Sequence, residues 1–153
     1  MHVYLLSHVR KLEDDAIEPK IIGIYSSLDV VNITIEKYKK IVGFKDYPDD
    51  FVVKKYEVIP QDGKELLTND TVYFLQHEYS VDEGGIIYDY FTNIDIYAAY
   101  DDAEEEMNEL IKDEVYPKSL DGLYAPYGFT IGKCILDEDG WTEGFLITTV
   151  HET

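Results

Sequence analysis

An internal duplication constrains the fold of this 153-residue chain more than any other feature. The segment Val-Tyr-Leu-Leu-Ser-His at residues 3–8 recurs 69 positions later as Val-Tyr-Phe-Leu-Gln-His at residues 72–77. The segment at residues 22–27 then recurs at residues 94–99, at an offset of 72. The offset grows by three residues, which places an insertion in the hairpin between the two matched segments.

A further match extends the duplication toward the end of the chain. Residues 48–51 correspond to residues 126–129 at an offset of 78. Because the matches keep the same order along the chain, we predict two tandem repeats, residues 1–67 and 68–153. Each half is too short for a large core of its own, so we expect the repeats to pack as one globular unit.

Each repeat reads as strand, strand, helix, strand and a hairpin return, which predicts an α+β fold with mostly antiparallel sheet. In the first repeat, β-branched and aromatic residues predict strands over residues 3–10, 20–25 and 51–59. The helix between them is expected to begin at a Ser26 or Ser27 N-cap and to end near Lys40, before Gly43.

The second repeat follows the same order. Its helix is expected to begin at Asp101 and Asp102, in the cap region, and to end near Asp113. Gly84-Gly85 is predicted as the tip of the preceding hairpin. After the helix, we expect a strand over residues 129–136, a turn at Asp137-Glu138-Asp139-Gly140 and a return strand over residues 141–149.

The charge of the chain is strongly negative and unevenly distributed. The net charge is −19, with 13 basic and 32 acidic residues. Residues 1–69 hold 10 basic and 12 acidic residues, whereas residues 70–153 hold 3 and 20. Such a surface repels phosphate backbones and anionic lipids and attracts basic proteins. We therefore expect a basic protein partner and no direct binding to nucleic acid or membrane.

The sequence also predicts a compartment. No apolar run approaches the roughly 20 residues of a membrane-spanning helix, and the start lacks the features of a signal peptide. Cys134 is the single cysteine and can form no intramolecular disulfide, as expected in a reducing environment. We expect a cytoplasmic protein.

Four motifs along the chain form a recognisable pattern. Residues 3–8 end a Val-Tyr-Leu-Leu strand in histidine, residues 22–27 read Ile-Gly-Ile-Tyr-Ser-Ser, and residues 43–48 read Gly-Phe-Lys-Asp-Tyr-Pro. Residues 141–145 read Trp-Thr-Glu-Gly-Phe, where the first half has no counterpart. With these motifs the chain resembles a family of short, mostly uncharacterised bacterial proteins. The resemblance implies a fold pattern and supplies no catalytic residues. By analogy, small acidic proteins of this kind resemble immunity proteins for bacterial toxins.

His8 and His77 occupy equivalent strand positions in the two repeats. A facing pair could hold a metal ion or transfer protons. Each histidine shares its strand face with a tyrosine and a leucine, which favours a hydrogen-bonded structural role instead. We therefore predict no metal site and no cofactor.

The other candidate sites have simple structural interpretations. Asp137-Glu138-Asp139-Gly140 with Glu143 departs from the spacing of a calcium loop and fits a hairpin turn. The serines lack a nucleophile elbow, and Cys134 lies in a predicted strand beside a single basic residue, Lys133. We predict that the chain is not an enzyme.

The second repeat carries the strongest surface feature. On its helix, Asp102, Glu105, Glu106 and Glu109 are expected to project into solvent, opposite an apolar stripe. The loop that follows is an insertion relative to the first repeat and holds Tyr116, Tyr124 and Tyr127. These seven residues could be only a solvated helix face and a cover for the core edge, or they could form a recognition surface.

The sequence leaves three functional hypotheses. The first is a non-enzymatic acidic binding protein that captures or neutralises a basic partner, with toxin immunity as its most specific form. The second is a nucleic-acid mimic that inhibits a DNA- or RNA-binding protein through spaced carboxylates. The third is a small metal-binding or enzymatic domain that uses His8 and His77.

Overall fold

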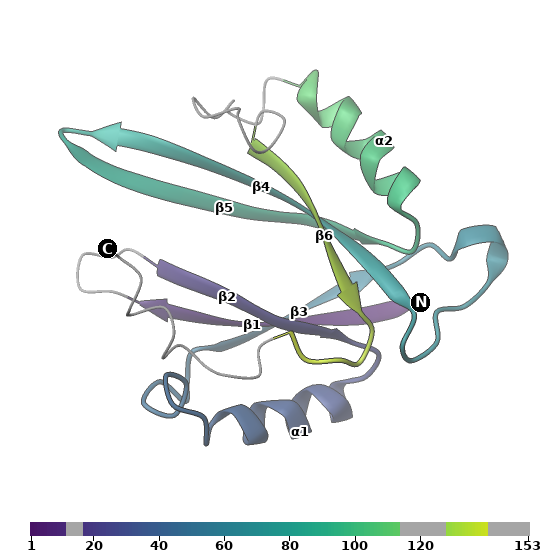
Figure 1. Ribbon diagram of the computed structural model, residues 1–153, viewed down its shortest axis with the longest axis horizontal. Coiled ribbons are helices and arrows are strands. Elements are labelled where there is room, and N and C mark those ends of the chain that lie inside the picture. Colours follow the sequence, from purple (N-terminus) through teal and green to yellow (C-terminus); the bar gives the residue numbers. More distant parts are fainter. Residues whose placement is uncertain (12–16, 114–127, 141–153) are drawn as a thin grey trace. The chain divides into compact units, whose positions relative to one another are not determined.

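The computed structural model describes residues 1–11, 17–113 and 128–140 (Figure 1). The chain divides into two compact units. The first, which we name the β1–β3 unit, contains the described residues of the ranges 2–57, 67–70 and 135–140. The second, the β4–β6 unit, contains Met1, residues 58–66 and the described residues of the range 71–134.

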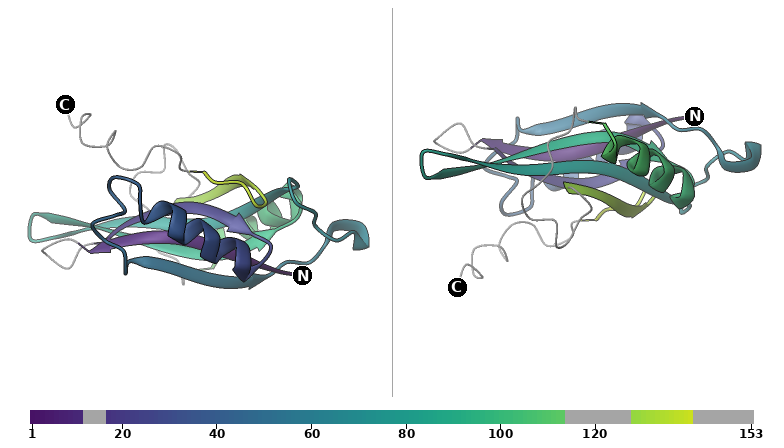
Figure 2. Two further views of the ribbon diagram at one scale, coloured as in Figure 1. Left: turned by 90° about the horizontal axis from the view of Figure 1, so that it is seen from below. Right: turned by 90° about the horizontal axis from the view of Figure 1, so that it is seen from above.

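The β1–β3 unit is a three-stranded antiparallel sheet with a helix on one face. Strands β1 (His2–Lys11), β2 (Ile17–Tyr25) and β3 (Phe51–Glu57) lie in the order β2-β1-β3, so β1 is central. The left view of Figure 2 shows helix α1 (Leu28–Tyr38) lying over this sheet. Large buried side chains fill the space between sheet and helix: Leu6, Ile22, Tyr25, Val31, Tyr38 and Phe44.

Helix α1 follows the predicted signals closely. Ser27 is the N-cap, and its side chain accepts a hydrogen bond from the Val30 amide at 3.3 Å. Asp29 lies in the first turn and Lys37 in the last, where each charge complements the helix dipole. The helix ends at Tyr38, two residues before the predicted end near Lys40.

The β4–β6 unit has the same kind of architecture. Strands β4 (Thr71–Glu83), β5 (Ile86–Tyr97) and β6 (Phe129–Ile135) lie in the order β5-β4-β6. Helix α2 (Tyr100–Ile111) lies over this sheet in the right view of Figure 2. Leu75, Met107 and Phe129 form its buried core, with Ile94, Tyr97, Leu110, Ile111 and Ile131 packed around them.

The β4–β5 hairpin tip and the N-cap of α2 can both be compared with the sequence predictions. Gly84 and Gly85 form the predicted hairpin tip, and both have positive φ, which glycine adopts without strain. The N-cap of α2 is Ala99, which has no side-chain capping bond. Asp101 and Asp102 therefore lie in the first turn and not at the cap. There their charges still favour the positive end of the helix dipole.

The predicted α+β class is confirmed, since the described residues form two antiparallel three-stranded sheets and two α-helices. The predicted return strand over residues 141–149 lies outside the described residues. Among the described residues, no helix is long and apolar enough to cross a membrane.

We predict that Ser27→Ala lowers the free energy of unfolding by about 1 kcal/mol, because the Val30 amide loses its side-chain acceptor. Asn32→Ala is the matched control, since Asn32 is an exposed residue in the interior of the same helix. Urea denaturation of the two variants measures the difference. Equal urea midpoints for the two variants would show that the Ser27 cap contributes nothing to the free energy of unfolding.

Candidate functional site

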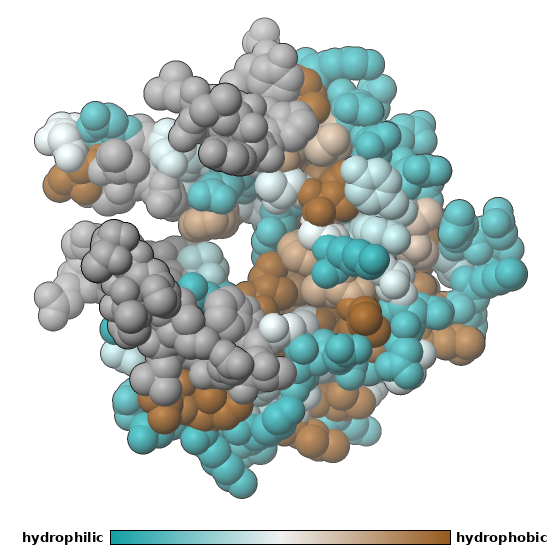
Figure 3. All heavy atoms as spheres, in the orientation of Figure 1, coloured by the Kyte–Doolittle hydropathy of each residue, from teal (hydrophilic) through white to brown (hydrophobic). Residues whose placement is uncertain are grey.

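The outer face of α2 presents a dense set of carboxylates. The four predicted residues Asp102, Glu105, Glu106 and Glu109 are all exposed, whereas Ala103 and Met107 on the opposite face are buried. Asp101 and Glu104 are exposed as well. Hydrophilic side chains cover this side of the helix in the space-filling view (upper right of Figure 3).

The sequence around α2 supplies almost no positive charge to balance this helix. Residues 71–113 contain twelve acidic residues and a single basic one, Lys112. Lys112 contacts Glu109 at 3.3 Å, and both side chains are about two-thirds exposed or more, so the pair contributes little stability. The Glu104 charge raises the pKa of the exposed Tyr100 hydroxyl, as a local excess of negative charge requires.

The remaining predicted contact residues, Tyr116, Tyr124 and Tyr127, lie outside the described residues. The seven predicted residues are thus four exposed carboxylates on one helix face and three tyrosines of the segment that follows.

His8 and His77 are both buried among aromatic rings. The Nε2 atom of His8 lies 3.0 Å from the Tyr47 carbonyl oxygen, so Nε2–H is the donor. Its ring contacts Phe51 edge-on at a centroid distance of 4.9 Å. The His77 ring lies 4.6 Å from that of Phe129. The two histidines belong to different units, and no group of three potential metal ligands occurs in the described part of the chain.

Cys134 lies in β6 and is partly buried. Burial raises the pKa of its thiol to about 11. At neutral pH the group is therefore protonated, and the protonated thiol is a poor nucleophile.

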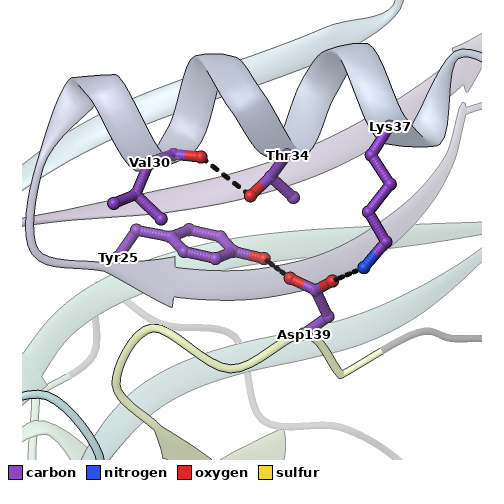
Figure 4. A network of polar contacts seen from close by, with 5 residues as sticks. All are labelled: Tyr25, Val30, Thr34, Lys37 and Asp139. Carbon is purple, nitrogen blue, oxygen red and sulfur yellow. Dashed lines mark hydrogen bonds and ion pairs between the residues drawn. The ribbon is translucent and has the colours of Figure 1, made fainter.

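A polar cluster of the β1–β3 unit is centred on Asp139. The Tyr25 hydroxyl donates a hydrogen bond to Asp139 Oδ1 at 2.6 Å, and Lys37 Nζ lies 2.6 Å from Oδ2 (Figure 4). Figure 4 also shows Thr34 donating to the Val30 carbonyl at 2.8 Å, beside the same cluster. The Asp139 side chain is only 16% exposed. A carboxylate at this depth is stable because charged and neutral donors meet it directly.

A second carboxylate, Asp137, accepts hydrogen bonds from the loop before α1. Its side chain accepts hydrogen bonds from the Ser26 amide at 2.7 Å and from the Ser26 hydroxyl at 2.8 Å. The Thr68 hydroxyl donates to it as well, at 2.8 Å. We name Asp137, Asp139 and the side chains that bind them the polar clamp.

The backbone of the same segment extends the edge of the sheet. The Asp137 amide donates to the Ile24 carbonyl at 2.9 Å, and the Gly140 amide donates to the Ile22 carbonyl at 2.6 Å. Gly23 and Asp139 form an antiparallel bridge. Residues 137–140 therefore lie along β2, held by backbone and side-chain bonds together.

The surroundings of Tyr25 and Tyr38 keep both hydroxyl groups protonated. Burial, and then the hydrogen bond to Asp139, raises the pKa of Tyr25 well above its usual value. Burial and the Asp139 charge raise the pKa of Tyr38 in the same direction. Both hydroxyls are therefore neutral at physiological pH, and Tyr25 serves as a donor that anchors a carboxylate.

Sequence reasoning predicted a turn at Asp137–Gly140 and missed the clamp. The partners Tyr25 and Asp139 are 114 positions apart, so no local pattern links them. One signal was present, namely Gly23 inside a strand, which marks a close backbone approach. A Cβ atom at Gly23 would lie 2.9 Å from the Glu138 carbonyl oxygen.

We predict that Tyr25→Phe lowers the free energy of unfolding at pH 7 by about 1.5–3 kcal/mol, the usual contribution of a hydrogen bond to a charged group. The native chain should also lose stability above about pH 10, because the unfolded tyrosine ionises first while the folded pKa is raised. Tyr25→Phe should flatten this alkaline loss.

Urea denaturation from pH 7 to pH 11 measures both effects. Lys39→Met is the control, since it removes only the exposed pair with Glu36 at 3.0 Å. The clamp would be energetically unimportant if Tyr25→Phe and Lys39→Met changed stability equally.

Comparison with known proteins gives one match. Residues 1–66 match the family model described as a domain of unknown function (DUF7336). The matched region contains β1, β2, α1 and β3 and ends before β4. Comparison with curated proteins and with solved structures gives no match. The first 66 residues are thus similar to an uncharacterised protein family, and the acidic helix α2 lies outside the matched region.

Proposed function

We propose that the chain is a non-enzymatic binding protein that captures a basic protein partner through its β4–β6 unit. The observation that carries the proposal is the exposed carboxylate face of α2. Residues 71–113, which include this helix, contain one lysine and twelve acidic residues. Neutralisation of a bacterial toxin is the specific role we favour, by analogy with other small acidic proteins.

The arrangement of charge on α2 costs the helix stability. Like charges stand four residues apart at Asp101 and Glu105, at Asp102 and Glu106, and at Glu105 and Glu109. Each such pair is unfavourable by about 0.2–0.5 kcal/mol. The last turn of the helix also contains no basic residue to complement its dipole. A partner that brings cations to this face would relieve these repulsions, so the pattern suits binding better than folding.

Carboxylates at the rim of an interface mainly accelerate association, whereas buried aromatic anchors mainly slow dissociation. We assign the first role to Asp102, Glu105, Glu106 and Glu109 and the second to Tyr116, Tyr124 and Tyr127.

We also propose that the two units are copies of one strand-strand-helix-strand repeat. Their strand orders, β2-β1-β3 and β5-β4-β6, correspond element by element. The central strand of each sheet has an irregularity after a leucine, Leu6 in one and Leu75 in the other, and these residues are 69 positions apart. Each buried histidine packs on a phenylalanine at the start of the third strand, Phe51 or Phe129. The charge difference then arose after duplication, on a fold that did not need it.

Peptides selected from a random display library against the chain provide a defined partner, and we expect them to carry net positive charge. Replacing Asp102, Glu105, Glu106 and Glu109 with Lys should slow their association by about tenfold or more and reduce its salt dependence. Stopped-flow kinetics at several salt concentrations measures the rate.

The matched control replaces four exposed acids elsewhere, Asp46, Asp49, Glu57 and Glu65, with Lys and changes net charge equally. Association with this control should slow by about twofold at most. If the control slowed association as much as the α2 variant, or if the selected peptides carried no positive charge, the proposal would be wrong.

Replacing Tyr116, Tyr124 and Tyr127 with Ala should leave the association rate of the selected peptides nearly unchanged and speed their dissociation. A truncated aromatic anchor costs about 2 kcal/mol, or roughly thirtyfold in affinity. Dissociation rates measured at low and high salt give the comparison. An unchanged dissociation rate would remove these tyrosines from the binding site.

A further inference from the structure

Strand β5 forms an edge of its sheet. In the order β5-β4-β6, β4 is the one described strand that pairs with β5. Large apolar side chains on β5 are exposed: Ile86 by 54%, and Tyr90 and Phe91 by 42% each. Hydrophobic surface also reaches the tip of the β4–β5 hairpin in Figure 3.

The other sheet edges carry features that discourage a further strand. On β2, Pro19 removes a donor, and the bridge between Gly23 and Asp139 occupies part of the edge. On β3, Lys54 and Lys55 are exposed, and β6 presents Lys133. Lysine and proline are the usual means by which natural edge strands avoid pairing.

The distal part of β5 contains none of these protective features. Residues 86–92 read Ile-Ile-Tyr-Asp-Tyr-Phe-Thr, with no proline, glycine or basic residue and with one charge. Six of these seven residues are β-branched or aromatic, and at an edge with which no further described strand pairs they form a strong template for strand pairing. An unprotected edge of this kind pairs readily with a further strand.

The hairpin also projects as an arm. Figure 1 shows β4 and β5 running past β6 and α2, so the distal arm is a two-stranded ribbon. Tyr79 and Tyr90 lie directly opposite each other and stack with centroids 5.0 Å apart at an angle of 17°. A two-stranded ribbon is only marginally stable in water, and a third strand would stabilise it.

We propose that the open edge of β5 binds an extended basic segment of the partner, which adds to the sheet as a further strand. Glu78, Asp82 and Glu83 are exposed on the same arm and favour a cationic segment. Arginine side chains could also stack on the exposed ring of Tyr90. A second copy would bring another strongly acidic arm, so like charges oppose pairing of β5 with itself.

This inference rests on the proposed function, because it assumes a basic partner, and it adds the mode of binding. The experiment uses the full chain and two capped peptides of equal charge, one alternating arginine with valine and one in which two prolines follow each arginine. Both match the charge of the β4–β6 unit, but proline lacks an amide donor, and in the arginine-proline peptide prolines fall on both edges of the strand, so neither edge keeps the row of donors that strand addition needs.

We expect the arginine-valine peptide to bind at least about tenfold more tightly than the arginine-proline peptide. It should also slow hydrogen exchange of the β5 amides. Tyr90→Lys, which gives the edge a protective lysine, should weaken its binding by about tenfold. The matched control is Val53→Lys, a similarly exposed position on β3, which should change binding by less than about twofold.

Equal affinity for the two peptides would overturn strand addition and leave capture by charge intact. Failure of both peptides to bind would overturn the proposed function as well. Self-association of the chain that Tyr90→Lys abolishes would assign the edge to a second copy and overturn the inference. Equal effects of Tyr90→Lys and Val53→Lys would also overturn it.

Discussion

The bonds that hold residues 137–140 along β2 are the constraint on which the organisation of the chain depends. The chain leaves the β1–β3 unit after Glu57, returns to it at residues 67–70 and returns again at Ile135, so the elements β4, β5, α2 and β6 lie in sequence between two parts of one unit. The return is secured where Asp139 meets Tyr25 and Lys37. The sequence of the β4–β6 unit is therefore connected to the β1–β3 unit before β4 and after β6. On this account, acidic residues can accumulate in the β4–β6 unit while the β1–β3 unit keeps its packing.

Local signals predicted the parts of the fold that local chemistry decides. Ser27 caps α1 because a serine before an apolar periodic segment can accept a backbone amide bond. The exposure of Glu105 and Glu109 followed from helical spacing opposite Met107, which is buried as expected. The burial of His8 and His77 followed from the apolar residues on the same strand faces.

Local sequence signals could not predict the contacts between residues that are far apart in the sequence. The segment at residues 137–140 has the composition of a turn, and nothing near it indicates that Asp137 binds Ser26 or that Asp139 binds Tyr25. The N-cap at Ala99 was also missed, because Asp101 and Asp102, two and three positions later, satisfy the same dipole preference as a cap. Strand order was needed to identify β5 as an edge, since sequence gives β-propensity but not the neighbour of each strand.

We propose that the two units divide two tasks, with stable packing in the β1–β3 unit and electrostatic recognition by the carboxylates of α2 in the β4–β6 unit. The central claim is that a basic partner binds the β4–β6 unit at α2 and β5. The most direct measurement is an NMR titration of the isotope-labelled chain with a library-selected basic peptide. We expect chemical-shift changes concentrated in the amides of residues 86–92 and 101–109. Changes confined to the β1–β3 unit, or no changes at saturating peptide, would contradict the account.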